Sequence, residues 1–307
     1  MASHRAPLRR FHRRRTIPHR SGATRTRLAH GLAAAALVAA ASAALVHARE
    51  QPWDQPGWPC EGKVDPSYVR GAEATGGKVM LVHPTEIAAT AAEMSASRRH
   101  GETVFRAGGH VAEGTYEFDI PIDSTIDGAH FFVSLQCLQS ATVIEPSGDE
   151  LRADEADVEV HEFRAIRMFT VGRPAPGPWR VRATGRGLMT VLVRARTPLS
   201  LTRVQLVEDA APVKGESAPG ARLRLETGLT GAAGRIEGRL IAWGGETLQR
   251  VDLAIQKASD LERIYAGEVI VPGAAFRIAV TGMDAGGFPF QRVYEQMFNY
   301  SSLPIAR

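Results

Sequence analysis

The sequence contains only two cysteines among 307 residues, Cys60 and Cys137. Two cysteines with no histidine pair at ligand spacing beside them are too few for a zinc site. The chain has no Gly-x-Ser-x-Gly elbow to present a nucleophilic serine. After residue 48 it also has no apolar run near the roughly 20 residues that span a membrane. These absences argue against a cysteine-based zinc site, an α/β-hydrolase nucleophile and a membrane span beyond residue 48.

Acidic residues are absent from the first 48 positions, which contain nine arginines and no lysine. The remaining 259 residues contain 28 basic and 33 acidic side chains, so their formal charge is −5 (28 − 33). The charge of +4 for the whole chain comes from the leading segment, and it does not argue for binding to nucleic acid.

The first 48 residues have the parts of an export signal. A long basic region precedes the 16-residue apolar run GLAAAALVAAASAALV, and Val46 and Ala48 occupy the −3 and −1 positions of a small-residue cleavage site. We therefore predict a signal peptide over 1–48, cleavage after Ala48, and a periplasmic or extracellular protein. The alternative is an uncleaved amino-terminal anchor, for which the run is short.

Residues 49–64 are rich in Pro, Gly and Trp and are predicted to form a linker. Cys60 lies in this linker and Cys137 in the β-rich region that follows. An oxidising compartment permits a disulfide between them, but their positions in the sequence do not show whether they are close in space. A bonded pair and two free thiols both remain open.

Residues 65–100 are predicted to form a short helix–strand–helix segment. Asp65 can cap a first helix with Pro66 at its first position, and Gly76-Gly77 can end it. KVMLV (78–82) predicts a buried strand, and PTEIAATAAEMSASRR predicts a second helix. One such unit cannot cover both faces of its strand, so this strand needs sheet partners in the chain or in another protein.

From residue 101 onward the apolar residues recur with a period of two, in short runs such as GTYEFDIPI and LMTVLVRAR. Gly, Pro, Asp and Ser separate the runs. About seven runs in 101–198 and six in 199–300 predict two consecutive Ig-like β-sandwich domains, with an unassigned tail at 301–307. The predicted fold class is therefore mainly β, with the helix–strand–helix segment and the signal sequence in front.

The run FRIAVTGMDAGGFPFQR (276–292) predicts a hairpin. Phe276, Ile278 and Val280 alternate with more polar neighbours, and Asp284 with Gly286-Gly287 supplies turn chemistry. Asp284 is also a candidate calcium ligand, although a hard cation needs six to eight oxygens and this loop offers few.

Several stretches together resemble the region that follows the von Willebrand factor A domain in hemicentin-type extracellular proteins. FRIAVTGMDAGGFPFQR is similar to the end of that region, YEFDIPIDSTIDGAHFFVSL and RPAPGPWRVRATG to its earlier parts, and YVRGAEATGGKVMLV to the last helix and strand of the A domain. The resemblance spans roughly residues 65 to 295 and implies an adhesion-type β-sandwich protein. The Asp-x-Ser-x-Ser metal loop of an A domain does not occur here, so the resemblance implies no metal site.

The acidic run GDELRADEADVEVHE offers the best candidates for cation binding outside that hairpin. Asp149, Asp154 and Asp157 are the candidate calcium ligands. A glycoside-hydrolase type of reaction would use two carboxylates from the same run, chosen among Asp149, Glu150, Asp154, Glu155 and Asp157. The alternative interpretation is a solvated acidic loop.

Trp243 precedes two glycines and is predicted to be exposed, where it could stack on a sugar ring.

We predict an exported, non-catalytic protein without a cofactor that recognises another envelope or extracellular protein. Tandem β-sandwiches would act in adhesion or as an envelope scaffold. The alternatives are a carbohydrate-binding protein that uses Trp243, and a hydrolase that uses the acidic run.

Overall fold

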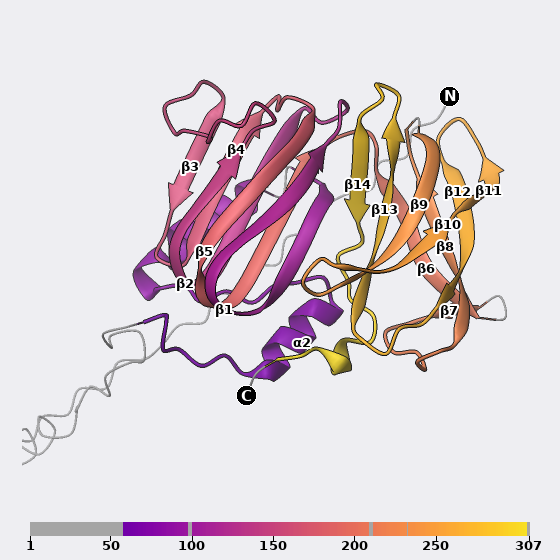
Figure 1. Cartoon of the computed structure of the whole chain (residues 1–307), viewed down its shortest axis with the longest axis horizontal. Helices are drawn as coiled ribbons and strands as arrows, with labels where there is room; N and C mark the ends of the chain where they lie inside the picture. Colours follow the sequence, from indigo (N-terminus) through magenta and orange to yellow (C-terminus); the bar gives the residue numbers. More distant parts are fainter. Residues whose placement is uncertain (1–57, 98–99, 209–210, 232, 306–307) are drawn as a thin grey trace, which may run out of the picture. The chain divides into compact units, whose positions relative to one another are not determined.

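The computed structural model describes residues 58–97, 100–208, 211–231 and 233–305 (Figure 1). Antiparallel strands in three sheets make up most of these residues, so the predicted mainly-β fold class is confirmed. None of the helices within these ranges is long and apolar enough to cross a membrane. The predicted signal sequence, its cleavage site after Ala48 and the linker residues 49–57 lie outside the described residues.

The first β part is one five-stranded sheet with the strand order β1-β5-β2-β4-β3. Three of its strands are long. Each of these three strands joins runs that the sequence pattern predicts to be separate strands. The prediction of about seven short strands here is therefore wrong. The strands are β1 (Glu102–Ile122), β2 (Gly128–Ile144), β3 (Val158–Glu162), β4 (Ile166–Gly172) and β5 (Gly177–Arg196).

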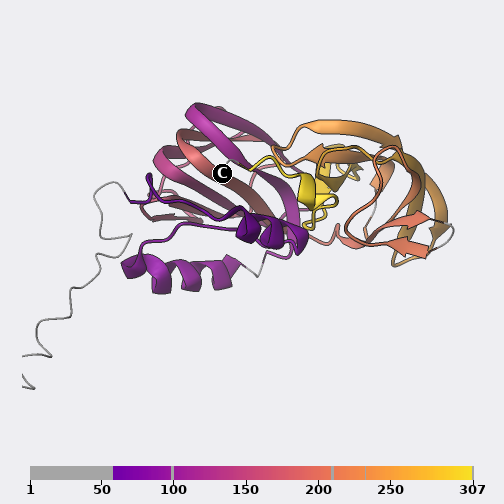
Figure 2. The ribbon, with the colours of Figure 1, turned by 90° about the horizontal axis from the view of Figure 1, so that it is seen from below.

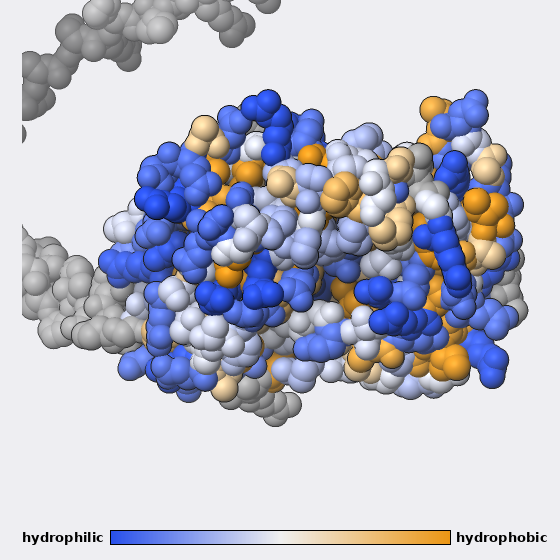
Figure 3. Space-filling model, turned by 45° about the horizontal axis from the view of Figure 1, so that its top comes forward, coloured by the Kyte–Doolittle hydropathy of each residue, from blue (hydrophilic) through white to orange (hydrophobic). Residues whose placement is uncertain are grey.

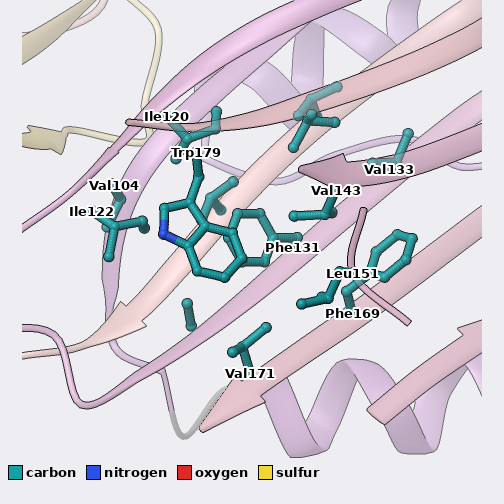
Figure 4. Packing of buried hydrophobic residues seen from close by; sticks show 14 of the residues in the cluster. Val104, Ile120, Ile122, Phe131, Val133, Val143, Leu151, Phe169, Val171 and Trp179 are labelled. Atoms are coloured by element: carbon teal, nitrogen blue, oxygen red, sulfur yellow. The ribbon is translucent and has the colours of Figure 1, made fainter. Parts of the chain in front are cut away.

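This sheet folds over on itself, and its two halves enclose a core. Phe131 on β2 pairs with Val193 on β5, and Trp179 lies 14 residues earlier on the same strand (193 − 179). A straight strand would separate positions 179 and 193 by roughly 46 Å. The rings of Phe131 and Trp179 are nevertheless 5.5 Å apart, so β5 bends back (Figure 4). The core therefore lies between the two halves of a single folded sheet.

The bend coincides with irregularities in all three long strands. The register shifts between Val111 and Gly114 in β1 and between Leu135 and Cys137 in β2. On β5, Gly185 has a φ of +148°, and a Cβ there would lie 2.0 Å from the carbonyl oxygen of Cys137. Only glycine fits this position, because any side chain would collide with the neighbouring backbone.

Residues 80–94 lie against the outer face of this sheet, whereas the preceding helix packs through Val69 on residues of both β parts, including Leu188 and Trp243 (Figure 2). Helix α2 (Pro66–Ala74) begins as predicted, since the Asp65 side chain accepts a hydrogen bond of 2.8 Å from the N–H of Ser67. A short 3-10 turn, η2 (Pro84–Glu86), leads into α3 (Ile87–Ser97), which confirms the second predicted helix.

The strand predicted at 78–82 is wrong, because residues 77–83 pair with no strand. The apolar side chains of this run are covered in another way. Met80 and Val82, together with Met94 of α3, pack on a cluster on the outer face of the sheet that includes Phe132 and Met168. The run crosses the face of a sheet and contacts it through side chains, so it needs no strand partner.

The second β part is a sandwich of two sheets. One sheet has the order β11-β12-β8-β6-β7 and the other the order β10-β9-β13-β14. Buried side chains from both sheets, including Leu225, Leu240 and Phe276, form a common core. The strands are β6 (Leu201–Glu208), β7 (Ala211–Val213), β8 (Arg222–Leu229), β9 (Ala233–Ala242), β10 (Thr247–Asp252), β11 (Ala254–Ala258), β12 (Arg263–Ile270), β13 (Phe276–Asp284) and β14 (Pro289–Val293), and the short turn η3 (Tyr300–Ser302) follows.

The run TLQRVDLAIQ, expected to be one strand, changes sheets at its middle. β10 ends at Asp252, the side chain of Leu253 is buried in the core, and β11 begins at Ala254 in the facing sheet. Because β10 and β11 are each the last strand of their sheet, one extended segment borders this side of the sandwich.

The hairpin β13–β14 is confirmed, and it also joins the two β parts. Arg292 of β14 forms an ion pair of 2.8 Å with Asp123, which follows β1. Gln291 donates a hydrogen bond of 3.0 Å to the carbonyl oxygen of Val104. Both contacts connect β14 to the first β part, so this strand forms much of the interface between the two β parts.

Candidate functional site

The acidic candidates do not converge on one point. The Asp154 carboxylate accepts a hydrogen bond of 3.1 Å from Arg152, and the Asp157 carboxylate accepts one of 2.9 Å from Arg173. Among the described residues, no three His, Cys, Asp or Glu side chains come together as a possible metal-ion group. The structure therefore does not bring Asp149, Asp154 and Asp157 together as a calcium centre.

The carboxylates considered for hydrolysis also contact separate partners. Glu150 lies 3.4 Å from Arg182 of β5, and Glu155 accepts the backbone N–H of Arg152 at 2.9 Å. These groups are exposed and bonded to different partners, as expected of a solvated acidic loop.

Asp157 borders a polar pocket of about 550 Å³ between the end of α3 and strands β3 and β4. His100 and His130 also line it, with their rings stacked 6.0 Å apart, and Glu93, Glu159 and Arg196 add charged side chains to its lining. The sequence contains no spacing that would have revealed this pair of histidines, because they come from a loop and from β2.

His130 is the most strongly perturbed group in this pocket. Its side chain is 3% exposed, and its Nδ1 lies 3.1 Å from the hydroxyl of Thr170. Burial, followed by the charges of His100 and Lys78, lowers the pKa of His130 to about 3. The ring therefore stays neutral near pH 7. A neutral imidazole with so low a pKa can take part in hydrogen bonds but is a poor general base.

Asp284 has a structural role. Its carboxylate accepts hydrogen bonds from the N–H and hydroxyl of Ser124 at 2.7 and 2.6 Å and from the N–H of Phe288 at 2.8 Å. Burial would raise the pKa of Asp284, but these hydrogen bonds outweigh it and the pKa is lowered. The candidate calcium ligand thus closes the hairpin turn and attaches it to the first β part.

The expectation that Trp243 is exposed is wrong. Its side chain is 4% exposed, and its indole N–H donates to the Glu73 carboxylate at 3.1 Å. Glu73 also accepts from Arg106 at 2.8 Å and from Arg277, so it is a shared partner of buried groups. No face of Trp243 is available for stacking on a sugar.

Cys60 and Cys137 form a disulfide with a Cα–Cα distance of 4.7 Å. Gln136, which sequence reasoning did not single out, reinforces the attachment. Its side-chain amide donates to the carbonyl oxygens of Pro59 and Gly62 at 3.0 and 2.5 Å. Together the disulfide and Gln136 hold the segment before α2 on the bend of the first sheet.

The clearest unexplained surface lies on the second sandwich. The described residues contain seven exposed large hydrophobic side chains, and four of them fall within 248–270. All five residues of the edge strand β11 are exposed. Figure 3 shows hydrophobic side chains at the surface on the side of the sandwich where β10 to β12 lie. We call this surface the β10–β11 edge; its apolar side chains are Leu248, Ile255, Leu261 and Ile270.

Comparisons with known proteins identify no family. No family model matches the chain, and no curated protein matches it. Among solved structures, the chain has a likeness to the Bacillus licheniformis lipase BlEst2 in its propeptide form, at 11% identity and a TM-score of 0.32. The likeness covers 62% of this chain and 40% of that one, so the chain spans about two fifths of that lipase. The resemblance to hemicentin-type proteins stays a prediction.

Proposed function

We propose that this chain is an exported, non-catalytic binding protein that recognises an extended segment of another protein at the β10–β11 edge. The observation that carries the proposal is the concentration of exposed apolar side chains beside an open strand. Ile255 on β11 is 55% exposed, and Leu261 in the turn that follows is 83% exposed.

An open strand offers main-chain groups as well as side chains. β11 pairs only with β12, so the outer side of its backbone faces no other described strand. A partner that adds one strand there gains main-chain hydrogen bonds, and its alternate side chains contact the apolar groups of the edge. Natural proteins usually protect such edges, so an edge left open beside apolar side chains indicates an interaction surface.

The charges of the edge favour an uncharged, apolar occupant. Arg250 and Lys257 carry positive charge, and Asp252 and Asp260 carry negative charge along the same segment. With both signs interspersed, the edge gives no net attraction to a strongly charged peptide. The specificity would come from Ile255 and Leu261.

An oxidising location supports a partner outside the cytoplasm. The disulfide between Cys60 and Cys137 is of the kind that persists in the periplasm or outside the cell. This agrees with the export signal predicted over 1–48 and with the resemblance to extracellular adhesion proteins. We include export in the proposal for these reasons.

Site-specific cross-linking tests the proposal. A photoreactive amino acid in place of Gln256 in the full chain, exposed to envelope and secreted proteins of the source cells, should capture a partner through an apolar, extended segment. Hydrogen exchange of the amides of residues 254–258 should slow in the complex, because the added strand occupies them.

Variants of the edge provide the decisive comparison. Covering two partly exposed aliphatic side chains contributes about 2–3 kcal/mol, so Ile255→Lys with Leu261→Lys should weaken binding at least about tenfold. Tyr68→Lys is the matched control, since Tyr68 is 71% exposed on α2 and should be neutral. Equal capture by the double variant, or unchanged exchange of the β11 amides, would contradict the proposal. If the cross-linker captures only a second copy of this chain, the edge mediates self-association and the proposal of a foreign partner is wrong.

A further inference from the structure

A second pocket lies at the bend of the first sheet, away from the β10–β11 edge. Its volume is about 500 Å³, within the usual range for small-molecule sites. Strands β1, β2 and β5 contribute to it where their register is irregular, and the segment before α2 forms its other wall. Irregular strand positions of this kind often occur next to binding sites, because they redirect side chains.

The inner part of this pocket is apolar. Val69 of α2 and Leu188 of β5 are buried in its lining, while Val64, Val111 and Ile305 are only half-buried. The half-buried side chains leave apolar surface facing the pocket. An aliphatic group placed there would cover that surface.

The rim of the pocket carries an excess of positive charge. Lys63 and Arg186 are exposed at the rim, and neither forms an ion pair with any residue that the structure describes. The carboxylate at the rim, Glu113, accepts a hydrogen bond of 3.0 Å from Gln139. Two exposed cations without an ion-pair partner among the described residues, beside an apolar lining, are complementary to a ligand with an anionic head and an aliphatic body.

The pocket wall is held in place before any ligand arrives. The disulfide from Cys60 to Cys137 and the hydrogen bonds of Gln136 fix the segment 59–62. Gln136 also accepts the backbone N–H of Leu188 at 3.3 Å, which ties the wall to the apolar lining. Such preorganisation lowers the entropy lost on binding.

We propose that this pocket binds a small aliphatic carboxylate, with the chain against Val64, Val111 and Leu188 and the carboxylate between Lys63 and Arg186. The proposal is independent of the protein-recognition function, because no residue of the β10–β11 edge lines this pocket.

Calorimetric titration of the full chain with decanoate, below its micellar concentration, tests the inference. We expect saturable binding of one decanoate, and at least tenfold weaker binding of 1-decanol, which has the same chain without the charge. Lys63→Gln with Arg186→Gln should weaken decanoate binding at least tenfold. The control pair Lys257→Gln with Arg222→Gln, which neutralises two exposed cations of the second sandwich, should leave it unchanged.

A second variant tests the apolar part. Val111→Asp should abolish decanoate binding because it places a carboxylate at the apolar lining, and circular dichroism would verify that this variant is folded. Absence of decanoate binding, equal affinity for decanol, or unchanged affinity in the Lys63/Arg186 variant would each overturn the proposal. Ile255→Lys with Leu261→Lys should still bind decanoate, so failure of the edge proposal and failure of this one are distinguishable.

Discussion

Replacement of Asp123 by asparagine should destabilise the chain more than any exposed substitution. The carboxylate of Asp123 and the guanidinium of Arg292 are 2.8 Å apart, and both side chains are 0% exposed. Removing one partner of a buried ion pair leaves the other charge without compensation, which typically costs about 3–5 kcal/mol. The isosteric Asp123→Asn change isolates this effect because it leaves no cavity.

The local contacts indicate that asparagine cannot substitute well. Arg292 donates to the carbonyl oxygens of Leu199 and Gln291 at 2.7 and 2.8 Å, and these bonds would remain. The Thr125 N–H donates to the other carboxylate oxygen of Asp123 at 3.2 Å. If the side-chain oxygen of the asparagine keeps the bond from Thr125, its NH2 group faces the guanidinium of Arg292. Both groups are hydrogen-bond donors, so neither can accept from the other.

Urea denaturation and thermal scans would measure the effect. With roughly 2–4 °C per kcal/mol for a chain of this size class, a loss of about 3–5 kcal/mol lowers the Tm by about 6–20 °C. The control is Asp252→Asn, which breaks the exposed 3.2 Å pair with Arg235 and should change the free energy of unfolding very little. A loss at Asp123 no larger than at Asp252 would refute the buried-pair argument.

Two further predictions concern acid and reducing agents. Because burial lowers the pKa of His130 to about 3 from 6.5, the unfolded chain binds that proton first, and stability falls as the pH drops below about 6.5. Protonation of His130 in the unfolded chain should lower the free energy of unfolding by about 2 kcal/mol between pH 6.5 and 5. Urea denaturation at several pH values should show that His130→Gln removes this pH dependence. The same pH dependence in the variant would contradict the assignment to His130. For the disulfide, whose cysteines are 77 residues apart, the chain-entropy estimate is about 4.5 kcal/mol. Dithiothreitol should therefore lower the stability of the wild type to that of Cys60→Ser with Cys137→Ser and leave the double variant unchanged, whereas no effect on the wild type would argue against the bond.

The sequence correctly predicts those features that depend on residues close together in the chain. The Asp65 cap, the helix at 87–97 and the β13–β14 hairpin depend on residues within a few positions of one another, and the structure confirms them. The sequence does not determine whether Cys60 and Cys137 are bonded, because the distance between them depends on how the first sheet bends. That bend depends on glycines such as Gly185, whose need for space appears only once β2 lies beside it.

The incorrect predictions share a cause, which is contact between residues far apart in the chain. The apolar run 78–82 has the composition of a strand, but a short apolar run does not reveal whether it pairs through its backbone or packs through its side chains. Trp243 is buried because its indole reaches Glu73, 170 positions earlier. The β10–β11 edge was not foreseen either, since the change of sheet at Leu253 turns one apparent strand into two edge strands.

The contacts of Glu73 determine how any binding function must be tested. Arg106 belongs to the first β part and Arg277 to the second, and both guanidiniums are buried against the same carboxylate. Burial, then the charge of Arg106, lowers the pKa of Arg277 to about 10, so this side chain remains charged at neutral pH and requires a counter-ion.

A chain shortened to begin at Gly101 would lose α2 with Glu73, and the two buried arginines would then lack their shared carboxylate. Loss of binding in such a chain would then report disruption of the joint between the β parts. Point substitutions in the full chain, at the β10–β11 edge and at the rim of the second pocket, keep this joint intact and can assign binding to one surface or the other.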